Sequence, residues 1–173
     1  VWAAINARER GASVVLLEQF ERNHARGSSH GDGRIWRKAY DEDVYVDMME
    51  QSLDRWHALG DADNEKVIEQ TGLVAFDEAS SDGSVFGGLT ALFERRGVPY
   101  SKLTAHEVRA RFAQWDRVPD NIRALHIDDA GCIFAGRAQL AAWARAESLG
   151  VETAENTALD AVEFSSGVQD SST

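Results

Sequence analysis

The chain has 173 residues, which suits one domain or part of a two-domain enzyme, and 43% of them are hydrophobic, as in globular proteins. The formal net charge of -11 disfavours nucleic acid as a partner, because an acidic surface repels a phosphate backbone. No apolar run approaches the ~18 residues that span a bilayer, so we expect no membrane partner.

The five histidines are scattered, and no spacing among them is typical of a metal site. The single cysteine, Cys132, allows no internal disulfide and is compatible with a reducing compartment. We therefore expect a protein without a metal site and with a cytoplasmic location. The oligomeric state stays open.

The first 18 residues have the pattern of the second half of a dinucleotide-binding βαβ unit. Apolar residues at helical spacing predict a helix over residues 1–10, which Gly11 ends. The unbroken apolar run at residues 14–17 predicts a buried strand of a parallel sheet. Glu18 ends that strand, where a carboxylate can bind a ribose hydroxyl. The first strand and glycine-rich turn of such a unit would precede residue 1.

Residues 19–33 form a long loop, and loops of this length inside compact domains are often functional. An amphipathic helix is predicted at residues 43–59, followed by a polar, exposed connection at 61–69. Later patterns predict strands at 71–76, 124–127, 132–134, 151–153 and 159–164, helices at 85–96, 104–112 (with a Thr104/Glu107 capping box) and 139–149, a loop at 80–84, and a frayed tail at 165–173.

The segment with most chemical information is residues 26–37, RGSSHGDGRIWR. Its glycines let a ligand approach the backbone, and serine hydroxyls with exposed amides bind pyrophosphate oxygens. His30 can donate a hydrogen bond or pass a proton. If the segment is helical, Arg34 and Arg37 project to one side and suit an anionic partner such as a carboxylate or an anionic flavin. The alternative is a solvated loop with surface arginines.

The run Gly-Ser-Ser-His-Gly-Asp-x-Arg-Ile-x-Arg at residues 27–37 resembles the segment after the second strand in monomeric sarcosine oxidases and in related N-methyl amino acid and pipecolate oxidases. The resemblance covers nearly the whole chain and is looser after the motif. It implies an α/β fold: a partial Rossmann-like FAD-binding domain, its first strand and glycine turn missing, with part of a sheet-based substrate domain. The expected parts are FAD-binding at 1–70, substrate-domain at 71–128, and a return to the FAD-binding part at 129–173.

The resemblance also implies roles for individual residues. Arg34, near the isoalloxazine ring, and His30 would be catalytic, and Arg37 would pair with the substrate carboxylate. The cofactor contacts would be Glu18 at the adenosine ribose, Gln19, Ser28, His30, Arg34, Ile35, and Leu159 through a backbone contact to adenine.

The sequence departs from the family pattern at several places. Gly33 stands where Thr or Ser is usual, so one flavin hydrogen bond would be lost, and Trp36 stands where a smaller aliphatic residue is usual. Cys132 lies in the wrong segment to link the flavin covalently, and we expect it to be a small buried strand residue. The family's oxygen-activating lysine and much of its substrate pocket belong to a second half that these 173 residues do not contain.

The implied activity is FAD-dependent oxidation of the C–N bond of a secondary amine or N-methyl amino acid, producing an imine and hydrogen peroxide in an intact parent enzyme. The chain itself is expected to be an amino-terminal piece that binds FAD poorly and turns over no substrate. Alternatives are an inactive fragment, a flavin-dependent amino acid dehydrogenase that uses another electron acceptor, and an NAD-binding domain. The long segment at residues 19–37 argues against the last.

Overall fold

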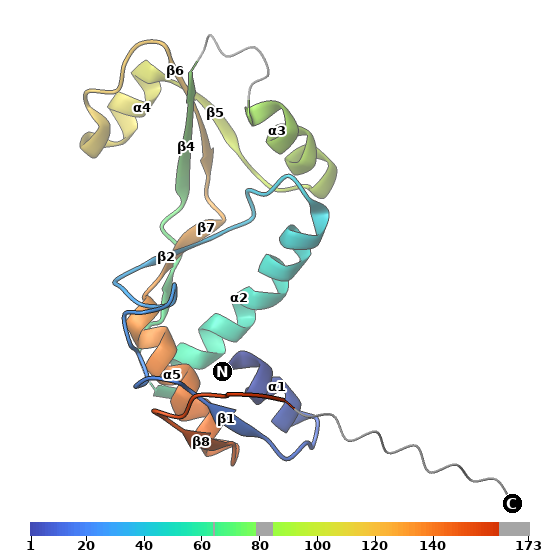
Figure 1. The fold of residues 1–173 in the computed structure, drawn as a ribbon. Helices are drawn as coiled ribbons and strands as arrows, with labels where there is room; N and C mark the ends of the chain where they lie inside the picture. Colours follow the sequence, from blue (N-terminus) through green and yellow to red (C-terminus); the bar gives the residue numbers. More distant parts are fainter. Residues whose placement is uncertain (64, 79–84, 163–173) are drawn as a thin grey trace, which may run out of the picture.

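The computed structural model describes residues 1–63, 65–78 and 85–162. The body is elongated, with a helix-covered strand pair at one end, a three-stranded sheet at the other, and a second small sheet between them (Figure 1). The mixture of helices and sheets confirms the predicted α/β class. Within the described residues, no helix is both long enough and apolar enough to cross a bilayer.

One end is built from the parallel strands β1 (Val15–Leu17) and β8 (Glu152–Ala154), with the helices α1 (Trp2–Glu9) and α5 (Ala135–Ser148). The parallel pairing confirms that the apolar run belongs to a parallel sheet. The prediction that both faces of the run are buried is wrong for the described residues. Val14 and Leu16 pack against the core cluster of α1 and α5, whereas Val15 and Leu17 are 58% and 42% exposed.

The middle sheet contains β2 (Arg34–Arg37), β7 (Ala130–Ile133) and β3 (Ile68–Glu69), all antiparallel. Segment 34–37 is therefore a strand and not a helix. The expectation that Arg34 and Arg37 project to one side, which required a helix, does not hold. The cause is long-range: β7 supplies backbone partners over the whole of β2. Trp36, which is 1% exposed, anchors the strand on the core.

The distal sheet has the order β4-β6-β5, from β4 (Leu73–Glu78), β6 (Ile122–Ile127) and β5 (Ser101–Thr104). Helices α3 (Val85–Arg96) and α4 (Ala105–Arg111) accompany it, followed by the short helix η1 (Ala113–Trp115). The capping box at Thr104 and Glu107 is confirmed, because each residue's side chain bonds the other's backbone amide. Strand β5, directly before this box, was not predicted.

Helix α2 (Asp43–Asp63) begins beside α3 and runs past the middle of the molecule toward α5 (Figure 1). Its Asp47 and Glu50 pair with Arg96 at the end of α3, and Asp43 pairs with Arg95. Together with a longer Arg96–Asp43 contact at 3.9 Å, these salt bridges tie α2 to α3.

Several predicted boundaries need correction. The segment 61–69 is not a polar, exposed connection: α2 continues through Asp63, and Val67 and Ile68 are 1% and 2% exposed because β3 joins the middle sheet. Strands β6 and β7 follow each other but belong to different sheets. Residues 159–162 form no strand, and the predictions for 80–84 and 165–173 lie outside the described residues. The proposed domain boundaries stay a prediction.

Candidate cofactor and substrate site

Glu18 lies directly after β1, at the edge of the β1–β8 pair. Its backbone amide donates to the Ala154 carbonyl at 2.9 Å, and its own carbonyl accepts from the Thr157 amide at 2.8 Å. The Phe20 amide donates to Glu18 Oε1 at 3.0 Å, and His24 Nε2 lies 3.4 Å from the same oxygen. Among the described residues, no hydrogen bond reaches Glu18 Oε2. One carboxylate oxygen is therefore available for a ligand hydroxyl.

Arg34 organises the second half of the loop that precedes β2. Its Nε donates to the Ser28 carbonyl at 2.7 Å, and Nη1 donates to the Gly33 carbonyl at 2.7 Å. Its Nη2 also donates to the carbonyls of Ser28 and His30. One guanidinium thus bonds three backbone carbonyls and ties the turns of the loop to the start of β2.

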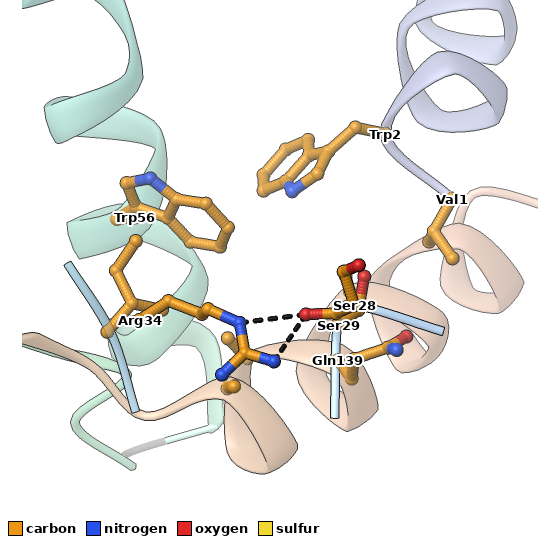
Figure 2. Close-up of a pocket in the computed structure, with 11 residues that line it drawn as sticks. Val1, Trp2, Ser28, Ser29, Arg34, Trp56 and Gln139 are labelled. Carbon is orange, nitrogen blue, oxygen red and sulfur yellow. Dashed lines mark hydrogen bonds between the residues drawn. The ribbon is translucent and has the colours of Figure 1, made fainter. Parts of the chain in front are cut away.

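A pocket of about 400 Å³ opens beside this loop. Figure 2 shows Arg34, Ser28 and Gln139 on one side of the pocket and the indoles of Trp2 and Trp56 on another. The two indole rings meet edge to face with centroids 5.6 Å apart. The pocket therefore combines hydroxyl, amide and guanidinium groups with aromatic faces, a composition that suits an oxygen-rich cofactor carrying a planar ring. The remaining lining comes from Val1, Ser29, Ile133, Ala135, Ala138 and Ala142.

Arg37 lies on the other face of β2, because alternate residues of a strand point to opposite sides. Its guanidinium carbon lies 4.9 Å from the ring centroid of Tyr40, and Tyr40 in turn contacts the ring of Tyr45 at 5.4 Å. Within the described part of the chain, no carboxylate forms an ion pair with Arg37. Ile35, on the same face, is 65% exposed. This face thus presents an arginine with its charge available beside aromatic and aliphatic surface.

The structure brings together only part of the predicted site. Ser28 and Arg34 share the pocket, while His30 takes part through its carbonyl, which accepts from Arg34. Gln19 and Leu159 are exposed, and Leu159 lies after β8 without regular structure.

Other pocket residues were not predicted as ligands. Trp2, Trp56 and Gln139 line the pocket. Trp56 lies within the amphipathic helix predicted at residues 43–59, and no local signal marked Gln139. The sequence pattern of a single helix does not reveal that α1, α2 and α5 converge beside the loop.

The departures from the family pattern have structural explanations. A Cβ atom at Gly33 would lie 2.8 Å from Cys132 Sγ, so Gly33 and Cys132 fit each other across the β2–β7 pair. Trp36 does not line the pocket: it is buried, and its Nε1 donates to the Met49 carbonyl and to Ser52 Oγ, each at 3.1 Å. Cys132 lies in β7 as expected but is only half-buried.

A parallel strand that ends in an acid, followed by a long loop beside a pocket, is the arrangement of α/β proteins that bind nucleotide cofactors. A family model described as FAD dependent oxidoreductase (DAO) matches residues 1–173. The chain belongs to this family, whose members depend on FAD.

Curated relatives agree with the family. The chain is 34% identical to mouse peroxisomal sarcosine oxidase over 111 residues, which cover 64% of this chain and 28% of the mouse protein. It is 26% identical to monomeric sarcosine oxidase of Bacillus sp. (strain B-0618) over 164 residues, which cover 94% of this chain and 42% of that protein. The chain therefore spans less than half the length of these relatives.

Solved structures share the fold. Glycine oxidase from Bacillus cereus superposes with a TM-score of 0.73 at 16% identity, covering 94% of this chain and 45% of the oxidase. L-proline dehydrogenase from P. horikoshii superposes with a TM-score of 0.71 at 20% identity, covering 88% of this chain and 40% of the dehydrogenase. The elongated arrangement of the described elements is thus the arrangement found within these larger enzymes.

Proposed function

We propose that the protein carrying this sequence oxidises the C–N bond of a secondary amine or N-methyl amino acid, and that these residues hold FAD and the substrate carboxylate. The observation that carries the proposal is that the two arginines of β2 lie on opposite faces of the strand. Arg34 faces the pocket with Ser28, whereas Arg37, without a carboxylate partner among the described residues, faces away from it. The names of the sarcosine oxidase relatives support this substrate class.

The residues present fit FAD. A free carboxylate oxygen on Glu18 suits a ribose hydroxyl, and Ser28 in the pocket suits a pyrophosphate oxygen. When bound, FAD supplies the acceptor for the hydrogen and electron pair that leave the C–N carbon. The remaining contacts proposed are Gln19, His30 and Ile35, with Leu159 at the adenine.

Each arginine has a distinct task in this proposal. Arg37 forms charge-assisted hydrogen bonds to the substrate carboxylate, which fixes the amine in a reactive orientation and lowers the entropic part of the barrier. Arg34 keeps the Ser28–His30 backbone in place and adds positive charge beside the pocket, which would stabilise negative charge on a bound flavin. The products in the complete protein are an imine and, with oxygen as acceptor, hydrogen peroxide.

The test is to purify the protein that carries this sequence and to measure its flavin absorbance and its peroxide production with sarcosine, pipecolate and bulkier N-methyl amino acids. An amine of matched size without a carboxylate is the control. We expect bound FAD and activity only with carboxylate-bearing amines. Activity with an artificial electron acceptor but no peroxide in air would instead identify a dehydrogenase. Absence of both FAD and activity would contradict the proposal.

The cytoplasmic location is also a proposal. The mouse and human relatives are named peroxisomal sarcosine oxidases, so cell fractionation with a peroxisomal marker distinguishes the two locations.

A further inference from the structure

Arg22, in the first half of the loop after β1, joins that loop to two other elements. Its Nε donates to Glu155 Oε1 at 2.6 Å, and its backbone amide donates to Glu155 Oε2 at 2.7 Å. Its Nη2 donates to Glu147 Oε1 on α5 at 2.9 Å. The guanidinium carbon also lies 4.9 Å from the ring centroid of Trp143, which is 2% exposed. Arg22 therefore links the loop, helix α5 and the segment after β8.

Backbone hydrogen bonds also connect the two segments that Arg22 joins. The Asn156 amide donates to the Phe20 carbonyl at 3.0 Å, and the Thr157 amide donates to the Glu18 carbonyl at 2.8 Å. Glu155 receives both its bonds from one residue, so its carboxylate is held by the main chain and the side chain of Arg22 together. This geometry fixes the separation between residues 18–22 and 155–157.

The ion pairs persist at neutral pH. Hydrogen bonds from the Arg22 backbone and side chain lower the pKa of the Glu155 carboxyl below its ordinary value of 4.5. The side-chain hydrogen bond from Arg22 lowers the pKa of the Glu147 carboxyl in the same direction. Both acids are therefore ionised wherever a flavoenzyme works.

We propose that Arg22 is a positioning residue for the adenosine end of the FAD site. This inference rests on the proposed function, in which Glu18 binds the ribose and the chain near Leu159 contacts adenine. Glu18 lies in the first of the two segments that Arg22 joins, and Leu159 lies two residues after the second. A partly exposed ion pair contributes little to global stability, so the main effect of Arg22 is on the geometry of these two segments.

The experiment measures the affinity of the apoprotein carrying this sequence for FAD, for ADP and for FMN, with the Tm of each variant. Arg22→Gln removes the side-chain bonds. We expect FAD and ADP to bind about 10-fold more weakly, a typical coupling between a positioning contact and a ligand. FMN lacks the adenosine, so its affinity should stay unchanged. Glu155→Gln should show the same pattern. The double variant should bind FAD and ADP little more weakly than Arg22→Gln alone, because both substitutions disrupt the same Arg22–Glu155 contact.

The matched control is Arg145→Gln, which removes an arginine on α5 from an exposed ion pair with Glu9 at 3.3 Å. It should leave all three affinities unchanged. If Arg22→Gln resembles this control, or weakens FMN as much as FAD, the positioning role is wrong while the proposed function stands. If the unaltered protein binds neither FAD nor ADP, the proposed function fails together with the inference. Should Arg22→Gln lower the Tm strongly, Glu147→Gln, which removes one of the two carboxylate charges that pair with Arg22, must still weaken ADP more than FMN.

Discussion

Arg34 and Arg37 lie three positions apart on β2 and point to opposite faces of the strand. Arg34 is paired in register with Ile133 and faces the pocket, whereas Arg37 is paired with Ala130 and lies against Tyr40. A helix would have placed both guanidinium groups on one side. The strand separates them, so each arginine can serve a different anion.

The close approach of β2 and β7 at Gly33 predicts an energetic coupling with Cys132. In Gly33→Ala the new Cβ would lie 2.8 Å from Cys132 Sγ, and the resulting crowding should destabilise the protein by about 1–2 kcal/mol. Adding Cys132→Ala removes the sulfur and should recover most of that loss. Urea unfolding of the two single variants and the double variant measures the coupling. Purely additive effects would show that the sheet relaxes around the methyl group.

Trp36 fastens β2 to α2 by packing and by its indole hydrogen bonds. Trp36→Phe keeps most of the apolar contact but removes the donor to Met49 and Ser52, so it should cost about 1 kcal/mol. Trp36→Ala should cost about 3–5 kcal/mol, because the side chain is 1% exposed and its removal leaves a cavity. Chemical denaturation checks both values. Equal costs for the two variants would contradict the packing role.

The capping box before α4 gives a pH-dependent contribution to stability. Hydrogen bonds from the Thr104 backbone and side chain lower the pKa of the Glu107 carboxyl below 4.5. A lowered pKa means that the ionised form favours the folded state, so this contribution is present above about pH 4.5 and is lost as the pH falls through the folded pKa.

The corresponding measurement is the Tm of Glu107→Gln and of the unaltered protein between pH 7 and pH 3. The variant should melt lower at pH 7, and the difference should shrink toward pH 3. A difference that stays constant with pH would show that the carboxylate charge contributes nothing.

Local patterns predicted much of the fold because its signals are short-range. The capping box and the helix from Val85 to Arg96 both depend on residues within a few positions of each other. Apolar run length was enough to place β1 in a parallel sheet. Gly97, with φ of +65°, directly follows this helix, which ends at Arg96 where the pattern predicted.

The errors come from contacts between distant residues. Segment 34–37 has no periodicity that separates a strand from a helix, and pairing with β7, about a hundred residues later in the sequence, decides its structure. Strand β3 was missed for the same reason, since its two residues become a strand by pairing with β7. The pocket depends on three helices that meet in space, so sequence spacing could indicate Ser28 and Arg34 but not Gln139.

The most direct test of the account is an anaerobic substrate titration of Arg37→Ala and Arg34→Ala in the protein carrying this sequence, with the FAD content of each. Loss of a charge-assisted bond costs about 1.5–3 kcal/mol. Arg37→Ala should therefore raise the apparent Kd for carboxylate-bearing amines roughly ten- to a hundred-fold while FAD content stays near normal. Arg34→Ala should instead slow flavin reduction, with a smaller effect on substrate affinity. If both variants match the unaltered protein, or if their effects are exchanged, the assignment of the two arginines is wrong.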